Sequence, residues 1–214
     1  MKKNAFTLAE VLITLGIIGV VAALVMPALI ANYEKKRIAI QFKKAYSVIS
    51  QAMKLSEIDN GPMEDWEPVQ GGTGVPLQYV DKYWKPYLKV INTCDTAATC
   101  GFDNEYPYTF LNGTASTIRV VYPSLRAALI TADGTMYIFE TASGSETNPS
   151  YNIYIDLNGP KPPNVYGKDF FQLVRVPGNG VMPTGYEMTE TQLDNNCSTG
   201  NGQYCSAKII KDGW

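Results

Sequence analysis

An apolar run near the N-terminus restricts the fold of this chain more than any other feature. The run extends from Val11 to Ala31 and is interrupted only by Thr14. About 20 apolar residues in a helix span the hydrocarbon core of a bilayer. The run therefore predicts a membrane-spanning helix. The remainder of the 214 residues is enough for one compact domain rather than two.

The residues before this run do not resemble an ordinary secretory signal. Such a signal carries its apolar stretch ahead of a small-residue cleavage site and loses that stretch on cleavage. Here the charged leader is only Met1–Ala5, with Lys2 and Lys3, and the apolar stretch follows it.

Charge and composition exclude several classes of function. The formal net charge is −2 and the pI is about 5.2, so we expect no nucleic-acid partner. The sequence has no histidine, which removes the commonest general base and metal ligand and rules out a Ser–His–Asp centre. It also shows no nucleophile elbow, phosphate-binding loop or paired-carboxylate motif. We therefore predict that the protein is not an enzyme.

The four cysteines form two close pairs, Cys94/Cys100 and Cys197/Cys205. An even count in close pairs predicts disulfides made outside the cytoplasm. Four cysteines allow three connectivities, of which two local bridges are the simplest; free or metal-binding thiols are the alternative. Lysines and an arginine follow the apolar run, and the positive-inside rule would place this C-terminal side of the span in the cytoplasm. Disulfides require the reverse orientation. We give the cysteines more weight and predict an extracytoplasmic C-terminal part.

The segment from Lys3 to Ile13, KNAFTLAEVLI, resembles the cleavage and methylation signal of type IV prepilins. The resemblance covers residues 3–31 and includes Gly16, Gly19 and Pro27. It implies that a prepilin peptidase cuts between Ala5 and Phe6 and methylates the new amino group of Phe6. Alanine stands before the cut, where the family usually has glycine.

Glu10 would be the fifth residue of the mature chain. In the family this glutamate pairs with the N-terminal amine of a neighbouring subunit and sets its register, and an ionisable residue at the edge of a membrane span is a functional candidate. The alternative is local, because Thr7-x-x-Glu10 also matches a helix capping box. Pro27 removes one helical hydrogen bond and leaves a carbonyl without its partner. Neighbouring helices in a filament could satisfy this carbonyl, and the alternative is a static kink in a single membrane anchor.

The chain after the span predicts an α+β fold. Ile38, Phe42, Ala45, Ile49 and Ala52 recur at helical spacing, and Gly61-Pro62 ends that pattern, so one helix should extend from Phe6 to about Glu57. A Gly- and Pro-rich loop over 61–76 and a short helix containing Val80 and Leu88 should follow. We then expect an antiparallel sheet of roughly four strands, from the candidates Thr117–Tyr122, Leu129–Thr131, Met136–Glu140, Tyr151–Ile155 and Phe170–Val176. Asp133-Gly134 predicts a hairpin turn.

One loop of this domain, Asp156 to Asp169, has oxygen-bearing side chains around a glycine turn. Asp156, Asn158 and Asp169 are candidate calcium ligands, because calcium favours six to eight oxygen ligands. Some pseudopilins of type II secretion bind calcium in a loop of the head domain. The alternative is an Asx-type turn stiffened by prolines.

These features together predict three parts: a cleaved leader (1–5), a helix (6–57) that is transmembrane over about 6–31, and an extracytoplasmic head domain (58–214). The resemblance implies a pilin or pseudopilin of a type IV pilus-like or type II secretion filament. Its partners would be prepilin peptidase, homologous subunits, the inner-membrane assembly platform and the membrane. The alternative is a membrane-anchored ligand- or calcium-binding module that does not assemble.

Overall fold

The computed structural model describes residues 7–66, 75–122, 124–140, 143–145, 148–150, 152–176 and 178–214. The chain divides into two compact units. We call Met1–Arg37 the helical unit and Ile38–Trp214 the globular unit. The predicted leader, Phe6, residues 67–74 of the predicted loop and Tyr151 lie outside the described residues.

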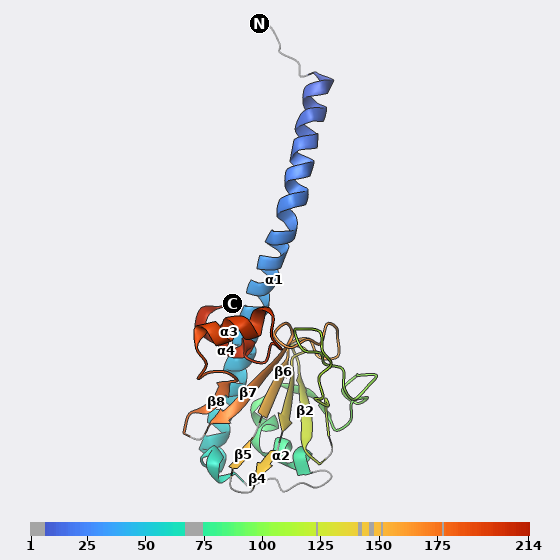
Figure 1. Cartoon of the computed structure of the whole chain (residues 1–214). Helices are drawn as coiled ribbons and strands as arrows, with labels where there is room; N and C mark the ends of the chain where they lie inside the picture. Colours follow the sequence, from blue (N-terminus) through green and yellow to red (C-terminus); the bar gives the residue numbers. More distant parts are fainter. Residues whose placement is uncertain are drawn as a thin grey trace. The chain divides into compact units, whose positions relative to one another are not determined.

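Helix α1 extends from Leu8 to Asn60 and is continuous through Pro27 (Figure 1). It ends three residues beyond the expected Glu57, where Gly61 adopts a φ of 80° that favours glycine. The amide of Gly61 donates to the carbonyl of Glu57 at 3.0 Å. Among the described residues, α1 is the one helix long and apolar enough to cross a membrane, and the apolar segment concerned is not buried within the chain.

The globular unit contains a six-stranded antiparallel sheet in the order β1-β2-β3-β6-β7-β8. Five consecutive antiparallel pairings build the sheet, so the predicted α+β fold with an antiparallel sheet is confirmed. The strands are β1 (Val90–Cys94), β2 (Arg126–Thr131), β3 (Met136–Glu140), β6 (Asn152–Asp156), β7 (Phe170–Val176) and β8 (Gly180–Pro183). A separate pair contains β4 (Ser143–Ser145) and β5 (Asn148–Ser150).

The β2–β3 hairpin turns at Asp133-Gly134, as the sequence predicts. Gly134 has a φ of 85°, and the amide of Thr131 donates to the carbonyl of Thr135 at 2.9 Å. The predicted strand Phe170–Val176 corresponds to β7, and the predicted Tyr151–Ile155 corresponds to β6 within one residue.

The prediction of a strand over Thr117–Tyr122 is wrong. Within this segment only Tyr122 forms an isolated bridge, to Arg126. Val120 and Val121 are nevertheless buried. Their β-branched side chains therefore fill a core position from an irregular segment, which is why the local pattern resembled a strand.

The helices outside α1 are short. The predicted helix over Val80–Leu88 is divided, because α2 (Val75–Tyr83) ends before a 3₁₀ turn, η2 (Lys85–Tyr87), that contains Pro86. Another 3₁₀ turn, η1 (Met63–Asp65), lies within the segment expected to be a loop. Two helices follow the sheet, α3 (Glu190–Ser198) and α4 (Cys205–Asp212).

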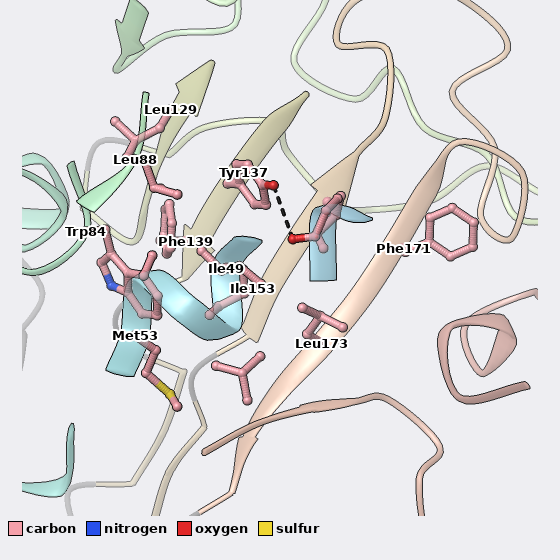
Figure 2. Packing of buried hydrophobic residues seen from close by; sticks show 14 of the residues in the cluster. Ile49, Met53, Trp84, Leu88, Leu129, Tyr137, Phe139, Ile153, Phe171 and Leu173 are labelled. Carbon is pink, nitrogen blue, oxygen red and sulfur yellow. Dashed lines mark hydrogen bonds between the residues drawn. The ribbon is translucent and has the colours of Figure 1, made fainter. Parts of the chain in front are cut away.

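Each face of the sheet has its own apolar core. On one face, Leu129, Tyr137 and Phe171 belong to one buried cluster with the buried side of α1 and with Trp84 and Leu88, which flank η2 (Figure 2). The Phe42 and Phe171 rings lie 4.6 Å apart, and the Tyr137 hydroxyl donates to the Ala45 carbonyl at 3.2 Å. On the other face, alternate strand residues pack with side chains from the segment between β1 and β2. This second group comprises Ala128, Met136, Ile138, Tyr154, Phe170, Cys94, Cys100, Phe102, Tyr108, Val120 and Val121.

Candidate functional site

The start of α1 is closed by a capping box. The Thr7 amide and hydroxyl each donate to Glu10 Oε2 at 2.8 Å, and the Glu10 amide donates to the Thr7 hydroxyl at 3.3 Å. The isolated chain thus places Glu10 in the local arrangement that the capping alternative predicts. Ala5 and Phe6, the predicted cleavage residues, lie outside the described residues.

The small residues of the predicted assembly surface are open in the isolated chain. A Cβ atom at Gly16 or Gly19 would meet nothing within 4 Å. Apolar side chains one helical turn away are exposed, for example Leu15 at 60% and Val20 at 62%. Pro27 leaves the helix continuous. No contact within the described chain therefore requires glycine at either position.

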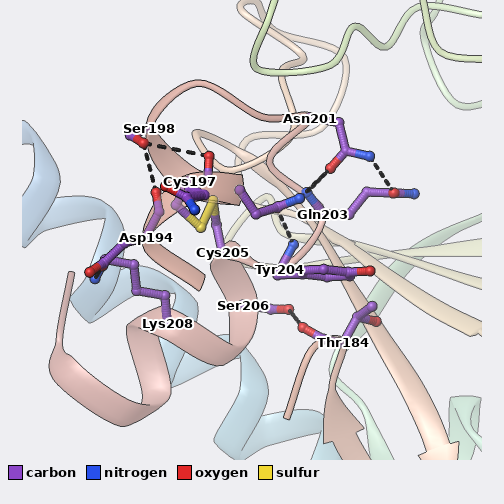
Figure 3. The surroundings of a disulfide bond; sticks show 12 residues. Thr184, Asp194, Cys197, Ser198, Asn201, Gln203, Tyr204, Cys205, Ser206 and Lys208 are labelled. Atoms are coloured by element: carbon purple, nitrogen blue, oxygen red, sulfur yellow. Dashed lines mark hydrogen bonds and ion pairs between the residues drawn. A yellow bond between two sulfur atoms is a disulfide. The ribbon is translucent and has the colours of Figure 1, made fainter. Parts of the chain in front are cut away.

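The two cysteine pairs form the local disulfides Cys94–Cys100 and Cys197–Cys205. The first closes a six-residue separation after β1, and the second joins α3 to α4 across eight residues. Around the second bridge, Asn196 Oδ1 accepts from the Tyr204 amide at 2.8 Å, and the Ser206 hydroxyl donates to the Thr184 carbonyl at 3.2 Å (Figure 3). Bridges over short loops stabilise mainly by limiting the unfolded states.

The loop between β6 and β7 begins and ends at buried carboxylates. Asp156 accepts hydrogen bonds from the Tyr108 hydroxyl at 3.0 Å and from the Asn158 amide at 3.2 Å. Asp169 accepts from the amides of Asn164 at 2.8 Å and Val165 at 2.7 Å. The Asp156–Asn158 contact is the expected Asx-type turn. Both carboxylates also act as structural acceptors within the loop.

The charged forms of both carboxylates are disfavoured by burial. Burial raises the pKa of Asp156 well above its ordinary value of 3.8, and the nearby Asp169 carboxylate raises that pKa further. Burial also raises the pKa of Asp169, although the Val165 and Asn164 amides oppose this shift. Two ionised carboxylates at this position therefore carry a free-energy cost that a bound cation would remove.

Two amide oxygens of the same loop lack partners. Oδ1 of Asn158 and Oδ1 of Asn164 are buried and accept no hydrogen bond from the described residues. Asn158 Nδ2 donates to the carbonyls of Lys161 at 2.9 Å and Pro162 at 3.1 Å, which fixes the orientation of that amide. Buried polar atoms are normally satisfied. Two carboxylates and two free amide oxygens are the ligand types that calcium prefers.

The described residues contain no group of three or more His, Cys, Asp or Glu that could hold a metal ion. A site in this loop would therefore depend on amide and carbonyl oxygens beside its two carboxylates. Sequence reasoning selected Asp156, Asn158 and Asp169 but missed Asn164. Asn164 has a positive φ of 54°, a conformation in which Asn and Gly are enriched. The Pro163-Asn164 pair, which is typical of turns, was the sequence feature that could have indicated this residue.

Two family models match the chain. Residues 1–26 match the prokaryotic N-terminal methylation motif, which is the prepilin-type signal of type IV pilins and pseudopilins. This match confirms the resemblance of the N-terminal segment. The chain matches no curated protein and no solved structure. Residues 28–214, which are most of the chain, match another family, and the protein therefore belongs to the Family of unknown function (DUF6613).

Proposed function

We propose that the protein is a structural subunit of a type IV pilus-like or type II secretion filament. The observation that carries this proposal is a prepilin-type methylation motif on a helix whose apolar side chains are exposed in the isolated chain. An apolar surface of this kind requires lipid or other apolar helices around it. A subunit that moves from the membrane into a helical stack is surrounded first by lipid and then by the apolar helices of other subunits.

The proposed pathway begins with cleavage between Ala5 and Phe6 and methylation of Phe6 by prepilin peptidase. The mature chain then lies in the inner membrane with its globular unit on the extracytoplasmic side, an orientation supported by two disulfides. The assembly platform transfers it into the filament, where Gly16, Gly19 and Pro27 pack among homologous helices. Repeated head-to-tail contacts that do not close into a ring produce such filaments.

In this proposal Glu10 exchanges its contact with Thr7 for the N-terminal amine of a neighbouring subunit. Two variants separate the charge of Glu10 from its capping role. Glu10→Gln keeps a side chain that can complete a capping box but removes the charge. Thr7→Val keeps the charge but removes the hydroxyl that contacts Glu10 Oε2. We expect Glu10→Gln to abolish recovery of the subunit in sheared filaments and Thr7→Val to assemble like the unmodified protein.

The measurement is the amount of subunit in the sheared fraction of the native host, with N-terminal mass spectrometry of the envelope fraction alongside. A methylated Phe6 start in both variants would show that processing is intact. Equal assembly by Glu10→Gln would contradict the proposed role of Glu10. An intact Met1 start in the unmodified protein would contradict the pilin-like pathway and favour the membrane-anchored binding module.

The loop between β6 and β7 supports a second proposal, that the globular unit binds calcium. Asp156, Asn158 and Asp169 would be ligands, and Asn164 would join them. The supporting observation is the pair of buried amide oxygens without partners beside two carboxylates with raised pKa values. This binding would stabilise the loop in either an assembling or a non-assembling protein.

Calcium should raise the thermal stability of the globular unit, and the effect should grow with pH. A carboxyl group whose folded pKa is raised favours folding below its unfolded pKa, near 3.8 for Asp156, and loses that contribution as pH rises through the folded value. Calcium would offset this loss. At free calcium 100 times its Kd, the stabilisation is about 2.7 kcal/mol.

The matched variant is Asn164→Gly, which removes one free oxygen while tolerating the positive φ at this position. Thermal unfolding in EDTA and in calcium, with magnesium as a comparison, is the measurement. We expect the calcium shift to fall in Asn164→Gly. Identical unfolding temperatures in EDTA and calcium across pH 4–8 would exclude the site.

A further inference from the structure

We propose that Tyr33, Lys35 and Lys36, which point in different directions around α1, form a binding surface around the helix for the phosphate groups of anionic phospholipids. These residues follow the apolar run of α1 by less than two helical turns. The surface belongs to the helical unit alone. It requires that α1 enters a bilayer, but it does not require assembly into a filament.

The first argument is the pairing of the basic residues after the apolar run. Arg37 Nη2 lies 2.8 Å from Glu34 Oε2, one helical turn away. Lys44 Nζ lies 2.7 Å from Asp133 Oδ2 in the globular unit. By contrast, Lys35 and Lys36 are exposed and have no ion pair or hydrogen bond from their side chains within the described part of the chain. Their charges are therefore available to an external anion.

The second argument is the distance of each lysine from the end of the apolar run. At 1.5 Å per residue, the backbone positions of Lys35 and Lys36 lie about 6 and about 7.5 Å beyond Ala31 along the helix axis. A bilayer of about 40–45 Å with a hydrocarbon core of about 30 Å leaves headgroup layers of about 5–7.5 Å on each side. With Ala31 at the edge of the core, both ammonium groups reach the layer that contains the lipid phosphates.

Tyr33 supports the same position of the helix. Its side chain is 66% exposed and makes no hydrogen bond within the described residues. Tyrosine is enriched at membrane interfaces, because its ring is apolar and its hydroxyl is polar. At about 3 Å beyond Ala31, its ring would lie at the boundary between the acyl chains and the headgroups.

The chemistry of the headgroup sets the expected selectivity. The apolar run contacts acyl chains, which zwitterionic and anionic phospholipids share, so it gives no preference between them. Two unpaired ammonium groups in the headgroup layer attract a lipid with net negative charge, and each contributes on the order of 1 kcal/mol near an anionic surface. A zwitterionic headgroup offers its phosphate already neighboured by a cation. The preference should therefore depend on Lys35 and Lys36.

The test uses the full chain reconstituted in phosphatidylcholine bilayers with spin-labelled phosphatidylglycerol or spin-labelled phosphatidylcholine. Electron paramagnetic resonance gives the ratio of protein-associated to bulk lipid for each label. We expect the unmodified chain to prefer phosphatidylglycerol. The double variant K35Q/K36Q should lose that preference, by up to about fivefold for each lysine, and 0.5 M salt should weaken it in the unmodified chain.

The chain offers a matched control in Lys43. This residue is also exposed and has no ion pair in the described structure, but it belongs to the globular unit and follows Ala31 by 12 residues in the sequence. Lys2 and Lys3 are present in all variants, so their contribution cancels. K43Q should keep the lipid preference of the unmodified chain. Glu10→Gln should also keep it, which separates this proposal from filament assembly.

Three results would overturn the proposal. One is an unchanged preference for phosphatidylglycerol in K35Q/K36Q, and another is an equal loss in K43Q. The last is displacement of the labelled lipid by inorganic phosphate at constant ionic strength, which would assign the lysines to a free anion instead of a headgroup. Helical content measured by circular dichroism should be the same in every variant, since all substituted side chains are exposed.

Discussion

Replacing Phe42 by alanine is expected to lower the free energy of unfolding of the globular unit by about 3–5 kcal/mol. The Phe42 side chain is fully buried on α1 and contacts the ring of Phe171 on β7. Alanine would leave a cavity between helix and sheet, and close-packed cores collapse only partly around such a cavity. Urea unfolding in detergent micelles, followed by tryptophan fluorescence, measures the loss, because all three tryptophans lie in the globular unit.

Ile40→Ala is the control for this variant. Ile40 lies two residues away on the same helix, but its side chain is 70% exposed. Its truncation creates no cavity and should change the free energy of unfolding by less than about 0.5 kcal/mol. Similar losses for the two variants would contradict the packing of this side of α1 against the sheet.

Replacing Arg126 by methionine is expected to lower the free energy of unfolding of the globular unit by about 3–5 kcal/mol. The Arg126 Nε and Nη2 atoms donate to Glu140 Oε2 at 2.9 and 2.7 Å, and the side chains are only 11% and 3% exposed. Tyr154 also donates to Glu140 Oε2, at 3.1 Å. Removing the guanidinium leaves a buried carboxylate with neutral donors alone, which does not compensate its loss of hydration.

Adding Glu140→Gln to Arg126→Met should recover much of this loss, because the double variant buries no charge. The surface pair Lys85–Asp81, with side chains 44% and 50% exposed, provides the contrast. Lys85→Met should cost at most about 1 kcal/mol. The same urea titration compares all three variants, and a Lys85→Met loss equal to that of Arg126→Met would contradict the assigned role of burial.

Local patterns in the sequence were enough to predict the elements whose signals are themselves local. The helical spacing of Phe42, Ala45 and Ile49 predicted the buried side of α1, and Asp133-Gly134 predicted the β2–β3 turn. The short strands β1 and β8 were missed. Asn92 and Thr93 in β1 are polar, and β8 contains Gly180 and Pro183, so neither strand shows a strong β pattern. Their strand conformation follows from pairing with β2 and β7.

The candidate sites also differ in whether their signals are local in the sequence or depend on distant residues. The methylation motif is contiguous, so sequence alone identified it and the residues around Glu10. The loop between β6 and β7 depends on Tyr108, which lies 48 residues before Asp156 and donates to its carboxylate. Nothing in the local sequence connects these residues. The missing partners of the Asn158 and Asn164 oxygens are likewise a property of the folded loop.

The strand order has a consequence for the way the protein folds during synthesis. In the order β1-β2-β3-β6-β7-β8, each strand after β1 pairs with the strand of that sheet that precedes it along the chain, so the sheet can grow at one edge as the polypeptide emerges. The helical residues Phe42 and Ile49 leave the ribosome before any strand, so their side chains stay exposed until the sheet residues that pack on them have been synthesised. Phe171 arrives only with β7. A chain released before β7 would therefore leave Phe42 without its ring partner and expose that part of the helix to proteases, so proteolysis can distinguish unfinished chains from complete ones.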